Sequence, residues 1–233
     1  MNPGSGEPPS IRPERRAREA AALRENLRRR KAQSRERAAT VDTAMIDEIL
    51  AFWFLPPGDP GRGAMRDVWF RRDAEFDAAI AARFIGAVEA ASGGALDHWA
   101  ASAVGALALI LVLDQFPRNL FRGAARAFAT DAKARAIAAR ALAAGFDRAL
   151  APVERMFVYL PFEHSEDLAD QQRAVELFAA LPPAPWRDGT LEFARRHLAA
   201  IERFGRFPAR NAALGRASTP EEIAFLAANP SGF

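Results

Sequence analysis

The densest group of ionisable side chains is the segment Glu163-His164-Ser165-Glu166-Asp167, which follows the aromatic stretch Tyr159-Leu160-Pro161-Phe162. A histidine oriented by a carboxylate is a common general base in enzymes that activate water or a hydroxyl group. Glu166 and Asp167 fall in the first turn of an expected helix, where acidic side chains also act as caps. Capping does not explain His164, so His164 and Glu166 are candidate catalytic residues. Two alternative interpretations of His164 are one ligand of an oxygen-rich metal site and a hydrogen-bonded structural histidine.

Asp114 is the second unusual acid, because it directly follows the apolar run 103–113. It is expected near the C-terminal end of a helix, where the helix dipole disfavours a carboxylate. A nearby cation must compensate, and Arg118 or Arg122 is close enough in sequence to form a bidentate pair. The pattern therefore indicates either a buried structural ion pair or a further candidate catalytic residue that acts with His164.

Arginine and asparagine follow a proline turn at two places in the chain. The segments are Phe116-Pro117-Arg118-Asn119 and Phe207-Pro208-Ala209-Arg210-Asn211. Guanidinium groups bind carboxylates and phosphates through two parallel hydrogen bonds, and asparagine can add further donors. The candidate ligand-binding residues, which include the arginine preceding the second segment, are Arg118, Asn119, Arg206, Arg210 and Asn211. Alternatively, these side chains satisfy the carbonyl groups of helix C-termini.

Histidine and cysteine usage gives no metal-binding signature. The chain has no cysteine, and His98, His164 and His197 are its three histidines. They lie too far apart in sequence for a recognised ligand spacing. We therefore expect no metal site, and the sequence indicates no cofactor.

The spacing of apolar residues is helical along the chain from Thr43 onward, and no strand-like alternation stands out. We expect eight or nine helices in antiparallel pairs, with the apolar run at the centre of the domain and too short to span a membrane. Helix boundaries are expected at Pro117 and Pro161, because proline disfavours helical angles in the residue before it. Thr130 and Ser165 are expected N-caps, and Thr219-Pro220-Glu221-Glu222 is a capping box.

The basic residues are concentrated in the N-terminal segment. The whole chain has 32 basic and 29 acidic residues, and positions 1–40 contain eleven of the basic and five of the acidic ones. Between positions 14 and 40, only Leu23 and Leu27 are large apolar residues. We expect residues 1–42 to form a disordered or partly helical basic arm that binds nucleic acid weakly, if at all. Residues 43–233 are expected to form a single all-helical domain in the cytoplasm.

Together, these segments resemble the bacterial domain of unknown function 924 over roughly residues 44–233. The resemblance rests on the polar segments above and on Phe52-Trp53-Phe54, Trp69-Phe70, Ala127-Phe128-Ala129-Thr130-Asp131 and Leu214-Gly215-Arg216. It implies a fold similar to the tetratricopeptide-like helical superfamily, and it implies no particular activity. The family usually has a histidine at the position of Ala209. If that histidine is catalytic, this chain lacks it, whereas an arginine and asparagine site would remain.

Two functions from different classes follow. The first is a binding module in which the Arg/Asn cluster grips an anionic group of a small molecule or peptide. The second is a hydrolase-like or metal-assisted enzyme that uses His164, Glu166 and Asp114. Both predict that residues far apart in sequence converge, because each polar segment lies at a helix end. We expect Arg118, His164 and Arg210 to line one shared pocket.

Overall fold

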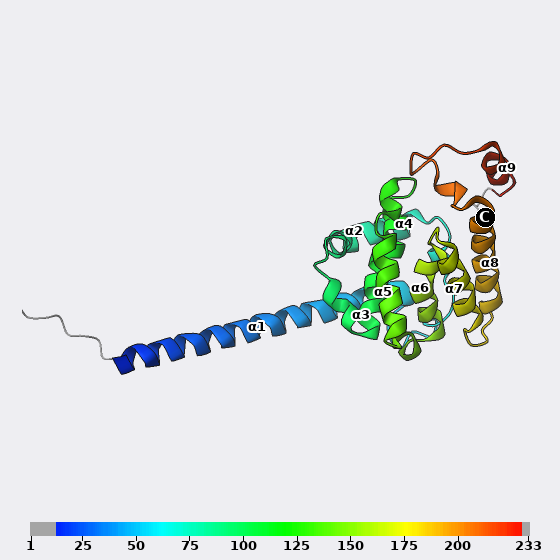
Figure 1. The fold of residues 1–233 in the computed structure, drawn as a ribbon. Helices are drawn as coiled ribbons and strands as arrows, with labels where there is room; N and C mark the ends of the chain where they lie inside the picture. Colours follow the sequence, from blue (N-terminus) through cyan, green and yellow to red (C-terminus); the bar gives the residue numbers. More distant parts are fainter. Residues whose placement is uncertain (1–12, 230–233) are drawn as a thin grey trace, which may run out of the picture. The chain divides into compact units, whose positions relative to one another are not determined.

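The computed structural model describes residues 13–229, and within this range the chain forms helices and turns without a strand. This confirms the predicted all-α fold class. Residues 1–12 of the expected arm lie outside the described range. The α-helices of the described part are α1 (Pro13–Phe54), α2 (Ala74–Ser92), α3 (Ala103–Ile110), α4 (Phe116–Leu120), α5 (Asp131–Ala143), α6 (Pro152–Glu163), α7 (Leu168–Ala179), α8 (Arg187–Phe204) and α9 (Pro220–Ala228) (Figure 1).

The chain divides into two compact units, residues 1–47 and residues 48–233. Within the first unit, residues 13–47 belong to α1. The side chains described between positions 18 and 41 are exposed, including Leu23 (61%) and Leu27 (55%). A helix without an apolar stripe has no face to bury, which explains this exposure.

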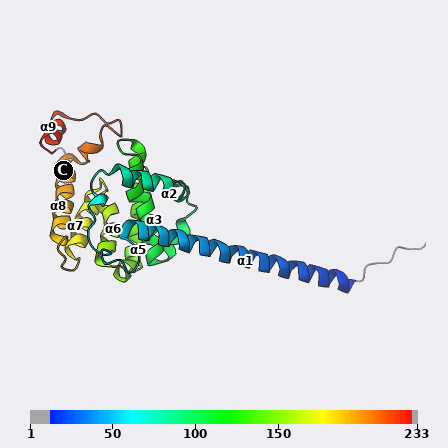
Figure 2. The ribbon, with the colours of Figure 1, turned by 180° about the vertical axis from the view of Figure 1, so that it is seen from behind.

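Helices α5, α6, α7 and α8 form a layered series in the second unit, and each packs on the next (Figures 1 and 2). The connections between them are short, as is typical of antiparallel neighbours. Helix α3 packs against both α5 and α6. It therefore occupies the centre, as the apolar sequence 103–113 predicted, and Leu107–Leu113 have no exposed surface.

Residues 103–120 form the one stretch of the described chain that is long and apolar enough to cross a membrane, and 72% of it is buried. Burial of this extent is what the core helix of a helical domain shows. Trp53, at the end of α1 and within the second unit, packs against this stretch through Phe116, with ring centroids 5.6 Å apart. Its ring also contacts Phe157 of α6 at 5.5 Å, so aromatic packing joins three helices.

The prediction that Pro117 ends the central helix is wrong. Leu111–Gln115 form one π-helical turn, and α4 continues from it through Pro117 to Leu120. Proline has no N–H group, so it cannot donate to the carbonyl of Leu113 four residues earlier. That carbonyl instead accepts a hydrogen bond from the hydroxyl of Thr130. The hydrogen bond that proline cannot make is thus replaced by one from the turn directly before α5.

One other predicted boundary and the predicted cap bonds of Thr130 and Ser165 also differ from the structure, although α5 begins directly after Thr130 as predicted. The hydroxyl of Thr130 makes no cap bond in α5, because it is used on Leu113. Pro161 lies inside α6, which continues to Glu163. The side-chain cap of α7 is Asp167, whose carboxylate accepts from the backbone N–H groups of residues 169 and 170. The capping box is confirmed, since Thr219 and Glu222 satisfy each other's backbone N–H groups at the start of α9.

Candidate functional site

Asp114 and His164 form a hydrogen-bonded pair between the π-helical turn and the C-terminus of α6. The Nδ1 atom of His164 lies 2.9 Å from each carboxylate oxygen of Asp114. Asp114 is fully buried and also accepts a hydrogen bond of 2.6 Å from Gln115. With Nδ1–H directed at the carboxylate, the neutral ring carries its lone pair on Nε2, which has no hydrogen-bond partner within residues 13–229. The His164 side chain is 14% exposed.

Arg118 extends this pair to Asp131 at the start of α5. Its Nη1 atom lies 3.3 Å from the Asp114 oxygen Oδ1, the same atom that His164 contacts. The same guanidinium donates two hydrogen bonds of 2.9 Å to the two oxygens of Asp131. Arg118 therefore bridges two carboxylates, as a planar bidentate donor can.

Arg210 reaches Asp131 from the segment between α8 and α9. Its Nη1 atom lies 3.5 Å from Oδ2 of Asp131, the oxygen that also accepts from Arg118. The Arg210 guanidinium lies over the rings of Phe128 and Phe207, at 4.8 and 4.5 Å from their centroids. The structure thus brings together Arg118, His164 and Arg210, which were predicted to converge. His164 and Arg118 share Oδ1 of Asp114, and Arg118 and Arg210 share Oδ2 of Asp131. That they line a pocket remains a prediction.

Burial and charge set the protonation states of the pair. Burial alone would raise the pKa of Asp114, but the charge of Arg118 and the interaction with His164 outweigh it and lower the pKa. Burial lowers the pKa of His164, and the charge of Arg118 adds to this effect. At neutral pH Asp114 is therefore ionised and His164 is neutral, the state in which a histidine can accept a proton.

A second buried pair lies beside the first and was missed by the sequence analysis. Oε1 of Glu163 lies 3.2 Å from Nδ1 of His197, which also donates to the carbonyl of Phe193. The rings of His197 and His164 are 6.5 Å apart. Burial and the charge of Asp114 raise the pKa of Glu163 to about 8, and burial lowers the pKa of His197 to about 3. Both groups are therefore uncharged at neutral pH.

Glu166, a candidate catalytic residue, is hydrogen-bonded to other residues of the domain. One carboxylate oxygen accepts from the backbone N–H of Phe207 at 2.8 Å, and both oxygens accept from Arg216 at 2.7 and 2.9 Å. These bonds lower the pKa of Glu166 against the effect of its burial. A carboxylate with three donors is occupied in holding the segment that carries Arg210.

The remaining candidate ligand-binding residues lie outside this cluster. Arg206 forms two bonds with Glu222 of α9, and Asn211 donates to Ser218 at 3.0 Å and to Glu222 at 3.2 Å. Asn119 donates to Asp77 of α2 at 2.7 Å. The predicted Arg/Asn cluster is thus divided in three. Arg118 and Arg210 share Asp131, Arg206 and Asn211 share Glu222, and Asn119 is bonded to Asp77.

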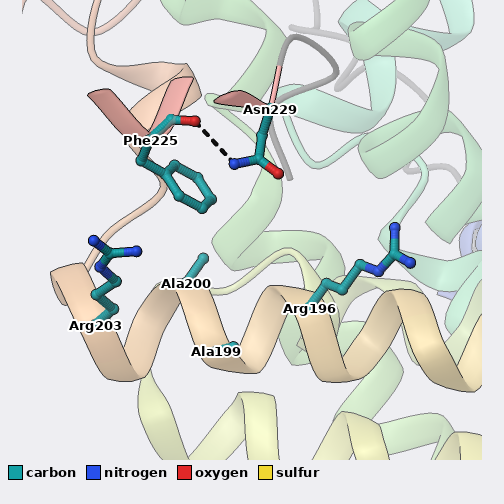
Figure 3. A pocket seen from close by; sticks show the side chains of 6 residues that line it. All are labelled: Arg196, Ala199, Ala200, Arg203, Phe225 and Asn229. Carbon is teal, nitrogen blue, oxygen red and sulfur yellow. Dashed lines mark hydrogen bonds between the residues drawn. The ribbon is translucent and has the colours of Figure 1, made fainter. Parts of the chain in front are cut away.

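Two further observations limit the chemistry of the site. Within residues 13–229, no three histidine, cysteine or acidic side chains are arranged to hold a metal ion. A surface cavity of about 280 Å³ lies between α8 and α9 and contains none of the predicted site residues. Figure 3 shows its lining: Arg196, Ala199, Ala200 and Arg203 from α8, with Phe225 and Asn229 from the C-terminal segment.

Comparisons with known proteins bear out the resemblance seen in the sequence. The family described as "Bacterial protein of unknown function (DUF924)" matches residues 49–230. Among solved structures, the chain is similar to a protein of unknown function, ATU0120 from Agrobacterium tumefaciens, with 44% identity and a TM-score of 0.70. That match covers 79% of this chain and 97% of the other. The comparison with curated proteins found no match.

Proposed function

The chain belongs to the DUF924 family of bacterial proteins of unknown function, and we propose that it is a hydrolase-like enzyme in which His164 acts as a general base on a small anionic substrate. The observation that carries this proposal is the 2.9 Å contact of His164 Nδ1 with buried Asp114, which leaves Nε2 without a partner in the described chain. A carboxylate on one ring nitrogen orients the histidine and stabilises the imidazolium that forms.

The reaction that suits this pair is the attack of water on an ester bond. Nε2 of His164 accepts a proton from the water molecule as its oxygen bonds to the electrophilic centre. The imidazolium is stabilised by ionised Asp114 and returns the proton to the leaving oxygen. Arg118 and Arg210 supply positive charge near the same carboxylates, where an anionic substrate or an oxyanion intermediate is stabilised. Glu166 is not needed as a reacting group.

The test is a panel of chromogenic phosphate and carboxylate esters assayed with the parent and with His164→Gln. Loss of a general base lowers the rate by about 100-fold or more, so we expect kcat to fall by that factor. His98→Gln is the matched control, because His98 is exposed and lies in a 3₁₀ turn outside the cluster. Activity that survives His164→Gln contradicts the proposal.

A binding module without chemistry is the second candidate, and one observation favours it. Asp131 has both oxygens bonded to Arg118, so Arg210 keeps N–H groups available for an anionic small molecule or peptide group. The same histidine variant separates the two functions. A binding module keeps its affinity for an anion in His164→Gln and shows no ester hydrolysis in the parent.

A further inference from the structure

Residues 207–216 form a loop that closes on itself. Nη2 of Arg216 donates to the carbonyl of Phe207 at 3.1 Å, which joins the two ends. The backbone N–H and Nε of Arg216 donate to the carbonyl and the side-chain oxygen of Asn211 at 2.8 and 2.9 Å. One 3₁₀ turn, Pro208–Arg210, lies inside the loop. The side chain of Arg210 therefore projects from a backbone that is braced on both sides.

Glu166 attaches this loop to the turn that carries His164. Its Oε1 atom accepts from the N–H of Phe207 at the start of the loop, and its two oxygens pair with Arg216 at the end. Because Glu166 is two residues from His164, the loop and the histidine share one anchor. A single carboxylate thus fixes where Arg210 lies relative to the Asp114–His164 pair.

Arg210 is the less completely paired of the two arginines at Asp131. Its guanidinium carbon lies over the rings of Phe128 and Phe207. Contacts of this kind leave the N–H groups at the guanidinium edge for polar partners. One N–H group makes a 3.5 Å contact with an oxygen already bonded to Arg118. A guanidinium has five N–H donors, and none of the Arg210 nitrogens is a buried atom without a partner. The donors that make no such contact therefore keep some surface open to solvent, and the Arg210 side chain, which is 12% exposed, can present them to a ligand.

Resting on the proposed function, we propose that residues 207–216 are the recognition loop of the site, in which Arg210 binds an oxyanion of the substrate and Glu166 is the positioning residue that holds the loop. The ligand chemistry is a pair of oxygens on one carboxylate or phosphate group, which matches the edge of a guanidinium. The contacts with Phe128 and Phe207 restrain the guanidinium, so the oxyanion is held in a defined orientation. The loop supplies recognition, whereas the Asp114–His164 pair supplies proton transfer.

The test measures binding of inorganic phosphate and of acetate without turnover, from the shift of the His164 imidazole signals in NMR titrations at constant ionic strength. We expect saturable binding of at least one of the two anions by the parent. Arg210→Gln is expected to weaken it by about tenfold or more, which corresponds to the loss of a charge-assisted pair. Arg195→Gln is the matched control, because Arg195 is exposed on α8 and forms no ion pair with any residue of the described range 13–229.

Glu166→Gln tests the positioning role. This variant keeps an acceptor for the N–H of Phe207 but loses the charge that pairs with Arg216. We expect faster amide hydrogen exchange in residues 207–216, weaker anion binding, and a His164 signal that is unchanged in the absence of anion. If anion binding is unaffected while exchange rises, Glu166 only stabilises the loop and its assignment as a positioning residue is overturned.

The outcomes separate this inference from the proposed function. Binding of neither anion by the parent, or equal binding by the parent and Arg210→Gln, overturns the recognition loop. His164→Gln retains an acceptor and donor for Asp114, so it is expected to bind the anion with an affinity close to that of the parent, measured by calorimetry. If the parent hydrolyses esters and His164→Gln loses hydrolysis but still binds the anion, both the proposed function and the recognition loop are supported. If the parent binds the anion but hydrolyses no ester, only the recognition loop is supported.

Discussion

Nδ1 of His164 lies 2.9 Å from both oxygens of Asp114, although the two residues are 50 positions apart in sequence. The contact joins the π-helical turn at the centre of the domain to the end of α6. The helix dipole disfavours a carboxylate at the position of Asp114, and the hydrogen bond from His164 helps to stabilise its charge.

Replacement of Asp114 by alanine is expected to destabilise the fold by about 3–5 kcal/mol, because it removes the buried carboxylate that accepts from His164 and pairs with Arg118. Asp114→Asn is expected to cost less, since the amide keeps hydrogen bonds to its neighbours. Urea unfolding monitored by circular dichroism measures both values. Parent-like stability in both variants would show that the buried pair contributes little to folding.

The same asparagine variant is expected to lower the pKa of His164. The Asp114 charge and its hydrogen bond raise that pKa, in opposition to burial and to the charge of Arg118. Removing the negative charge leaves the opposing effects in place, so protonation of His164 requires a lower pH. An NMR titration of the imidazole signals measures the change, and a pKa that rises in Asp114→Asn would be the wrong sign.

Glu163→Gln is expected to stabilise the protein at alkaline pH. The pKa of Glu163 is raised from 4.5 in the unfolded chain to about 8 in the fold, so the fold loses stability as the pH rises between these values. Glutamine mimics the protonated acid and removes this loss. The variant should match the parent near pH 4 and exceed it at pH 9 by at least about 1.4 kcal/mol, the value of one pKa unit. Denaturant unfolding at both pH values measures it, and a constant difference would contradict the prediction.

Thr130→Val removes the hydroxyl that satisfies the carbonyl of Leu113. The carbonyl is buried and Pro117 cannot serve it, so the expected cost is about 1–3 kcal/mol, the penalty of an unpaired buried polar group. Thr190→Val is the control, because its hydroxyl donates to carbonyls of its own helix, at Trp186 and Arg187. Equal stability losses in the two variants would show that the contact with Leu113 has no special role.

Deletion of residues 1–40 is expected to leave the melting temperature of the remaining chain unchanged. The side chains described between positions 18 and 40 are exposed, so their removal takes away little buried surface. Weak binding of nucleic acid, where it is detected in the full chain, should disappear with the deletion and fall with salt. A drop of several degrees in differential scanning calorimetry would contradict the prediction.

The fold class follows from the sequence because apolar spacing and capping residues are local signals. The pairing of Asp114 with Arg118 is equally local, since residues four apart meet on a helix. The partner of His164 is not local, and the alternative roles of Asp114 and Glu166 could be separated only in three dimensions. The segment Phe207–Arg216 illustrates this. Arg210 and Asn211 are neighbours in sequence and were assigned to one cluster, yet Arg210 contacts Asp131 and Asn211 contacts Glu222.

Asp131 and the Glu163–His197 pair illustrate what sequence analysis misses. Asp131 is the first residue of α5, a position where acidic residues are common because of the helix dipole. Its sequence position therefore does not indicate that it binds two arginines. His197 lies on a helix face that becomes buried only when α8 packs on α7. The protonated state of Glu163 beside it depends first on burial and then on the charge of Asp114, which is 49 residues away in the chain. The burial that produces these protonation states is a property of the assembled domain.

The single π-helical turn at Leu111–Gln115 also sets the rotational phase of the central helix. A π turn holds one more residue than an α turn for the same hydrogen-bonded closure, and each residue of an α-helix turns the chain by about 100°. Removing one residue from this turn would rotate α3 relative to the part of the helix that carries Asp114 and Arg118. The apolar side chains of α3 and these two polar side chains would then no longer both face their present partners. One of the two would lose its partners, either the aromatic core or His164 and Asp131. The number of residues between α3 and α4 therefore matters as much as which residues they are. Deletion of one residue from Leu111–Gln115 should destabilise the fold far more than a conservative substitution there.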